Sequence, residues 1–283
     1  MTRTLSVATA AAAGALLIAA GATPASAQQQ DWSGPYVGIY GGGTSVNDQS
    51  DETLRFDRNL DGTYGDPVTL VAAGGANAFS PGFCGGAAYG PTAAQGCDSD
   101  SNGALAGVKA GYDMQFGSFV LGAVVDYAVV DQEDSVTGFS TTPAYYTFTR
   151  NLQSMAALRA RLGYAVGPAL VYATGGGVIA KVDNSFTTSN GVNTFTARED
   201  DDEADGYQWG GGVEYALAPN LTVTGEYLYT SVDTGDHVIR VGAGTAPAAN
   251  PFIQAPNTTG TDIIRSNSRF GTHALTIGMN YRF

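Results

Sequence analysis

The chain has 283 residues, a formal net charge of −13, 39 glycines and 15 tyrosines. It shows no basic patch or stripe, which argues against nucleic acid as a partner. Its length suits one large or two small soluble domains, and it equally suits one small β-barrel with long connections, a class rich in glycine and tyrosine.

The N-terminus has the composition of a secretory leader. Arg3 precedes an apolar, alanine-rich stretch over residues 5–21, and Ala25-Ser26-Ala27 is a small-x-small cleavage site. We therefore predict a signal peptide over residues 1–27 and one mature domain over residues 28–283; an uncleaved N-terminal anchor is the alternative. No later segment approaches the ~20 continuous apolar residues of a spanning helix, so a membrane-spanning chain would have to be a barrel.

The chain contains two cysteines, Cys84 and Cys97, in a stretch rich in glycine and proline. One nearby pair in a secreted chain most often forms a disulfide, which we predict here. Metal binding is the alternative, but neither a CxxC motif nor an adjacent histidine supports it. We expect no cofactor.

Eight segments alternate between apolar and polar residues. Each is close to the ~9–11 residues that a tilted strand needs to cross a bilayer. The first is the least regular, because Tyr36 and Tyr40 are out of phase with Val37 and Ile39. The expected strands are Tyr36–Val46, Leu105–Phe116, Phe119–Val130, Ser154–Val166, Leu170–Lys181, Tyr207–Leu217, Leu221–Thr230 and His273–Phe283.

The connections between these strands alternate in length. Three are tight, at residues 117–118, 167–168 and 218–220, and consist of glycine, serine, alanine, proline and asparagine. Four are long, at about 47–104, 131–153, 182–206 and 231–272. Short turns at one rim and long loops at the other are typical of an outer-membrane barrel, with the termini and tight turns on the periplasmic side.

Charged residues share one face of each expected strand. Period-two alternation places the opposite, apolar faces outward. For the strand at 170–181, this assignment puts Leu170, Tyr172 and Val178 outside and Lys181 inside. Charges inside so narrow a barrel must pair, so we predict an interior network of Lys109, Asp113, Asp126, Arg159, Arg161, Lys181, Glu214, Glu226 and Arg282.

An acidic run, Glu199, Asp200, Asp201, Asp202 and Glu203, lies in the third long connection. Clustered carboxylates are a weak candidate for a Ca²⁺ site. The spacing does not fit an EF-hand loop, and a solvated acidic loop is the simpler interpretation.

The last strand alternates from Leu275 and ends at Phe283. This ending, the leader, the opening Trp32–Gly38 and the segment Glu226–Tyr229 resemble the small outer-membrane β-barrel proteins of alphaproteobacteria, the opacity-like or outer membrane immunogenic group, related in architecture to the OmpA transmembrane domain. The resemblance implies an eight-stranded antiparallel barrel in a Gram-negative outer membrane. It also implies contact with outer-membrane lipid and lipopolysaccharide, recognition of the terminal Phe283 by the barrel-assembly machinery, and contacts with host or phage.

The sequence is compatible with four functions. The leading hypothesis is a non-enzymatic barrel that supports the envelope and makes surface contacts through acidic loops. A narrow porin-like channel is the alternative, although eight strands leave little lumen. An outer-membrane enzyme, such as a lipid A-modifying acylhydrolase or an omptin-like protease, would have to use His237 or His273. His237 lies in the last long connection beside Asp236, and His273 is followed by Ala-Leu and not by a nearby serine of the kind that the acylhydrolases use. A soluble lipocalin-like binder would have the same alternation with its faces reversed.

Overall fold

The structure, a computed structural model, describes residues 30–46, 51–100, 102–199 and 202–283. The leader predicted over residues 1–27 lies outside the described residues. Among those that are described, no helix is long and apolar enough to span a membrane.

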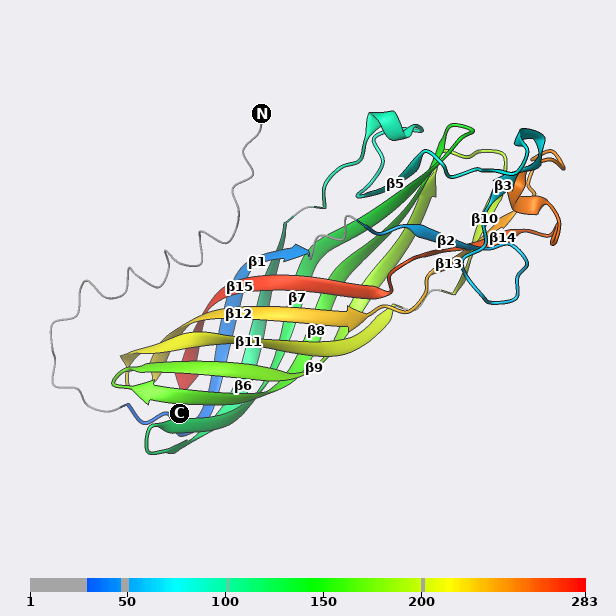
Figure 1. Ribbon diagram of the computed structural model, residues 1–283. Helices are drawn as coiled ribbons and strands as arrows, with labels where there is room; N and C mark the ends of the chain where they lie inside the picture. The colour runs from blue at the N-terminus through cyan, green and yellow to red at the C-terminus, as the bar shows by residue number, and fades with distance from the viewer. Residues whose placement is uncertain (1–29, 47–50, 101, 200–201) are drawn as a thin grey trace.

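Eight antiparallel strands form a ring, in which β15 pairs with both β12 and β1 (Figure 1). The prediction of an all-β chain with eight antiparallel strands is confirmed. Within the ring, residues along each strand largely alternate between buried and exposed, as expected when one face of the strand points into the ring and the other points outward. The ring strands are β1 (Gly34–Val46), β6 (Gly103–Phe116), β7 (Phe119–Ser140), β8 (Ala144–Val166), β9 (Ala169–Thr188), β11 (Glu203–Ala218), β12 (Leu221–Asp233) and β15 (Arg269–Arg282).

Tight turns join these strands at the end of the ring where the C-terminus lies (Figure 1). Gly117 and Gly167 each open a two-residue hairpin with a φ of 62° and 57°, a conformation that glycine adopts without strain. These turns fix the register of the hairpins, and hence which residues face the interior.

At the other end, β7, β8 and β9 continue well past the ring (Figure 1). The connection expected at 131–153 is therefore mostly strand: β7 runs to Ser140 and β8 begins at Ala144. The other long connections are also partly folded, and they supply a second sheet in the order β10-β13-β14-β2. Its strands are β2 (Leu54–Asp57), β10 (Thr194–Glu199), β13 (Val238–Gly242) and β14 (Thr261–Arg265).

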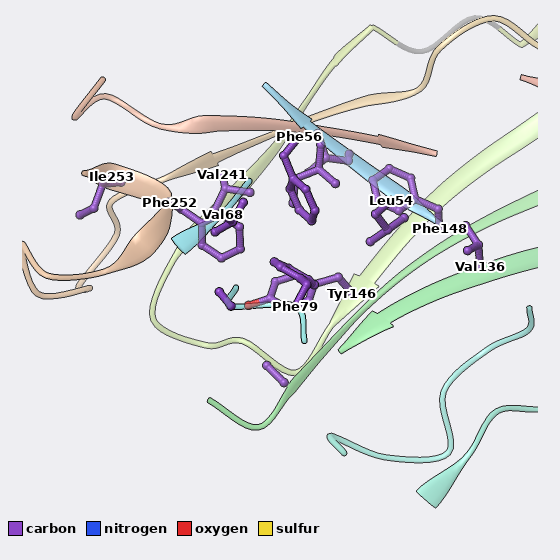
Figure 2. Packing of buried hydrophobic residues seen from close by; sticks show 14 residues of the cluster. Leu54, Phe56, Val68, Phe79, Val136, Tyr146, Phe148, Val241, Phe252 and Ile253 are labelled. Carbon is purple, nitrogen blue, oxygen red and sulfur yellow. The ribbon is translucent and has the colours of Figure 1, made fainter. Parts of the chain in front are cut away.

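This second sheet and the distal parts of β7, β8 and β9 enclose a hydrophobic core, and we call the whole assembly the outer layer (Figure 2). Phe79 lies at its centre, 4.5 Å from Phe56 and 5.2 Å from Tyr146 between ring centroids. The outer layer is thus a packed unit and not a set of solvated loops. It also includes the short strands β3 (Thr69–Leu70), β4 (Ala76–Asn77) and β5 (Gly82–Gly85) and the 3₁₀ turns η2 (Val71–Ala73), η3 (Ala93–Gln95) and η4 (Pro251–Ile253).

The predicted disulfide between Cys84 and Cys97 is present. Cys84 lies in β5, which pairs with the distal part of β7. The bond therefore ties the end of the first long connection to β5 of the outer layer.

The outward faces of the ring carry large apolar side chains, including Ile277 at 71 % and Val108 at 57 % exposure. Outward-pointing tyrosines form two aromatic belts, with Tyr112 and Tyr164 near the tight turns and Tyr127 and Tyr207 toward the other end. An apolar band between aromatic belts is the surface that a bilayer solvates.

The predicted faces of β9 are wrong. Leu170, Tyr172 and Val178 point into the ring, and Lys181 is exposed on its outer side. The two-residue turn at 167–168 pairs Val166 with Ala169, and residues paired across a hairpin share a face. Since Val166 points outward, Ala169 and every second residue after it do so too.

Candidate functional site

The ring interior holds eight of the nine charges predicted to lie there, and all eight side chains are buried. Lys181, the ninth, lies outside the ring and pairs in register with Glu203 of β11. The eight form two groups along the barrel. The turn-end cluster comprises Asp113, Arg161, Glu214 and Arg282; the mid-barrel cluster comprises Lys109, Asp126, Arg159 and Glu226.

In the turn-end cluster, two guanidinium groups alternate with two carboxylates. Arg282 Nη2 lies 2.7 Å from Asp113 Oδ2 and 3.3 Å from Glu214 Oε1. Arg161 pairs with the same two acids. Asn280 and Thr222 donate further hydrogen bonds to Glu214 Oε1, at 3.0 and 2.6 Å. Each buried charge therefore has at least two partners, which offsets its loss of hydration.

Aromatic rings pack against the guanidinium groups of this cluster. This packing role was not apparent from the sequence. Trp32 is fully buried, and Arg282 lies 4.9 Å from the centroid of its ring. Tyr36 and Tyr172 flank the guanidinium of Arg161, at 5.8 and 3.9 Å from their centroids. Cations over aromatic faces are favourable, most of all where water is excluded.

The irregular first strand now has an explanation. Tyr36 and Tyr40 point inward and pass over Gly111 and Gly107 of the neighbouring strand β6, where a Cβ atom would overlap the rings. Two glycines facing two tyrosines across a strand pair were a signal that could have been found.

The mid-barrel cluster is built around Arg159. This side chain lies 2.9 Å from Asp126 and 3.1 Å from Glu226, and Tyr40 donates a 2.9 Å hydrogen bond to Asp126. Lys109 Nζ lies 3.4 Å from Thr224 Oγ1 and 5.8 Å from the Tyr40 ring centroid. The cluster thus crosses the ring from β6 and β7 to β12.

Above the mid-barrel cluster, the interior becomes mostly apolar, although it also holds buried polar side chains such as Gln208, which donates to Thr230 at 2.7 Å. Met155, Leu228 and Phe270 are buried there with alanine and valine side chains. The inward residues of β7 follow this change, since Asp126 is succeeded by Ala128 and Val130. Charged, aromatic and apolar side chains in turn fill the ring, as expected of an eight-stranded barrel.

A third group of charges joins the ring to the outer layer, and we call it the outer-layer cluster: Glu52, Asp100, Asp134, Arg150 and Arg265. Arg265 Nε and Nη2 donate to Glu52 at 2.8 and 2.6 Å, and Nη2 also lies 2.7 Å from Asp134. Arg150 Nε donates to the same Asp134 oxygen at 2.7 Å. These five groups come from the first connection, β7, β8 and β14. None of the five was predicted to belong to a site, because all of them lie in segments that were expected to be loops.

Burial and then the adjacent Asp134 carboxylate raise the pKa of Asp100 to about 7. Burial opposes the ionised form of Asp134 too, but Arg265 and Arg150 outweigh it and lower the pKa of that carboxyl. Asp100 is thus protonated in mildly acid solution, beside an Asp134 carboxylate that two guanidinium groups keep ionised.

We expect the outer layer to loosen as the pH rises through about 7. Asp100 has a pKa of 3.8 when unfolded, so the stability it contributes is fully present below that pH and is lost as its folded pKa is passed. After correction for the intrinsic pH dependence of hydrogen exchange, the outer-layer amides should be more strongly protected at about pH 5.5 than at about pH 8.5. In Asp100→Asn, which keeps the acceptor for the Ser135 amide, this difference should vanish; a difference of unchanged size would contradict the assignment.

The remaining candidate residues do not form a site in the described part of the chain. Asp200 and Asp201, like the side chain of Glu199, lie outside the described residues, while Asp202 and Glu203 are exposed beside Lys181. Within residues 30–46, 51–100, 102–199 and 202–283, no group of three or more His, Cys, Asp or Glu side chains could hold a metal ion.

The two imidazoles lie in different parts of the molecule. His237 packs against Phe148 in the outer layer, with 6.0 Å between ring centroids. His273 lies on the outer face of the ring, where its Nδ1 is 2.6 Å from the Tyr227 hydroxyl. Phe283 is 70 % exposed beside Tyr281.

Known proteins resemble this chain in sequence or in fold. The family described as "Outer membrane protein beta-barrel domain" matches residues 13–283. The 31 kDa outer-membrane immunogenic proteins of Brucella melitensis biotype 1 and Brucella suis biovar 1 are each 30 % identical over 191 residues, 66 % of this chain and 69 % of theirs. The outer membrane protein OprG from Pseudomonas aeruginosa has a similar fold, with a TM-score of 0.50 and 12 % identity over 91 % of this chain and 99 % of that one.

Proposed function

Because the chain belongs to the outer membrane β-barrel domain family, and is therefore an outer-membrane protein, we propose that it is a non-enzymatic barrel with a closed interior. Its role is to support the envelope and to present the outer layer to the surroundings of the cell. The observation that carries this proposal is the filled interior, where two charge clusters and an apolar layer follow one another along the barrel.

In this proposal the tight turns and both chain ends face the periplasm, and the outer layer faces outward. The aromatic belts and apolar band contact outer-membrane lipid and lipopolysaccharide. The last strand, ending at Phe283, is the segment that the barrel-assembly machinery would recognise. The outer layer would meet host or phage surfaces, because it is the part that projects furthest from the ring (Figure 1).

Single-channel recording in planar bilayers tests the closed interior. We expect no large, stable conductance from the purified protein, because ion-paired side chains occupy the cross-section. The variant Arg159→Ala serves as the comparison, because it removes the side chain at the centre of the mid-barrel cluster. Reproducible long-lived channels in the unaltered protein would contradict the proposal and favour the narrow channel.

A further inference from the structure

The outer layer contains a cavity of about 230 Å³ at the end furthest from the tight turns. Each of the long connections contributes to its lining: Leu70 and Phe79 from the first, Thr142 from the second, Asn190 from the third and Phe252 from the fourth. The mouths of β-barrels are frequent ligand sites, and convergent loops on a rigid scaffold often carry binding residues.

The inner wall of this cavity is apolar and pre-formed. Phe79, Tyr146 and Phe252 line it, and each is at most 3 % exposed. Their rings contact one another, with 5.2 Å between the centroids of Phe79 and Tyr146 and 5.7 Å between those of Tyr146 and Phe252 (Figure 2). A wall held by the core of the outer layer needs no ordering when a ligand binds.

The rim is polar and uncharged. Ser140, Thr141, Thr142, Ser189, Asn190 and Asn250 surround the opening, and none of the lining residues is charged. Hydroxyl and amide side chains both donate and accept hydrogen bonds. Several are already fixed in place: Asn190 Nδ2 donates to the Tyr146 hydroxyl at 2.9 Å, and Asn250 Oδ1 accepts from the Phe252 amide at 3.1 Å.

We propose that this cavity binds one uncharged sugar residue, free or at the end of a glycan. A pyranose ring offers an apolar C–H face to the accessible apolar lining, which includes Pro143 and Val192 in front of the buried aromatic rings, and hydroxyl groups, each a donor and an acceptor, to the rim. A purely apolar ligand would cover the exposed hydroxyl groups of Thr141 and Thr142 without offering them a partner, which is unfavourable. A peptide would need an extended groove, and an anion would meet a cavity with no cation in a chain of net charge −13.

The proposal deepens the proposed function, because it names what the outer layer would recognise. Binding to purified protein does not depend on conductance or on orientation in the membrane, so failure here leaves the closed barrel untouched. Conversely, a conducting barrel would leave the cavity and its ligand class unchanged.

The test is a titration of the full chain with sugar probes. The protein is purified in a detergent without sugar headgroups, and binding is measured by ligand-observed NMR. The probes are glucose, galactose, mannose and N-acetylglucosamine with their methyl glycosides, and glucuronate serves as the charged counterpart of glucose. We expect saturable binding of at least one neutral probe and an affinity for glucuronate at least about tenfold weaker than for the best of them. No saturable binding of any neutral probe, or equal binding of glucuronate, would overturn the proposal.

Two variants locate the site. Val192 lines the cavity and is 47 % exposed, so Val192→Trp should obstruct the mouth and lower affinity at least about tenfold without disturbing the core. Thr142→Trp, in the second long connection, should obstruct the cavity and lower affinity in the same way. Thr63→Trp, on an exposed turn that does not line the cavity, is the control. Unchanged binding in both cavity variants would refute the location.

Discussion

Replacing Arg161 with methionine is expected to lower the free energy of unfolding of the barrel by about 3–5 kcal/mol. Arg161 is 4 % exposed and pairs with Asp113 and Glu214. Without it, two buried carboxylates share the single guanidinium of Arg282, and one negative charge is left uncompensated in a dry interior. Removing one partner of a buried ion pair is far more destabilising than the net contribution of the pair suggests.

Urea unfolding in detergent, followed by heat-modifiable migration on gels and by circular dichroism, measures this effect. The double variant Arg161→Met/Glu214→Gln leaves Asp113 paired with Arg282 at 2.7 Å, so it should recover most of the loss. Leu162→Met, on the outer face of the same strand, should change stability by less than about 1.5 kcal/mol. If the single variant were as stable as this control, the charges would contribute nothing to the barrel.

The ring of strands was predictable because membrane solvation imposes a strict period of two on each strand. Arg159, Arg161 and Arg282 could be assigned to the interior because they lie on the face opposite the apolar residues, which contact lipid in a membrane barrel. Lys181 could not be placed correctly in this way, because the outward face of β9 was inferred from the hydrophobic side chains of Leu170 and Tyr172. In a filled barrel, large apolar and aromatic side chains also serve as interior packing, so hydrophobicity does not decide the face there. The turn at 167–168 does decide it.

The outer layer was not predictable in the same way. Its strands are short, and their pairing joins residues far apart in the chain, as where Leu54 of β2 lies opposite Arg265 of β14. No local period signals such contacts. The distal part of β7 shows the same limit: Gln132, Asp134 and Val136 are buried beyond Val130, but residues 131–135 are all polar. An apolar–polar alternation therefore does not mark the longer strand or the inward Asp134.

Replacing Arg265 with methionine is expected to release the outer layer while leaving the ring folded. Arg265 connects β14 to Glu52 of the first connection and to both the side chain and the main-chain carbonyl of Asp134. Its loss leaves Arg150 to balance two buried carboxylates. Opening of the outer layer should become easier by about 3–5 kcal/mol, the usual penalty for an orphaned buried charge.

Hydrogen exchange with peptide resolution separates the two parts of the molecule. In Arg265→Met, amides of β2, β13 and β14 should exchange faster, whereas those of β12 and β15 inside the ring should keep their protection. Arg55→Met is the matched control, because Arg55 lies in β2 of the same sheet but is exposed. Faster exchange throughout the ring would mean that the outer layer and the barrel unfold as one unit, and the outer-layer cluster would then be a structural part of the barrel itself.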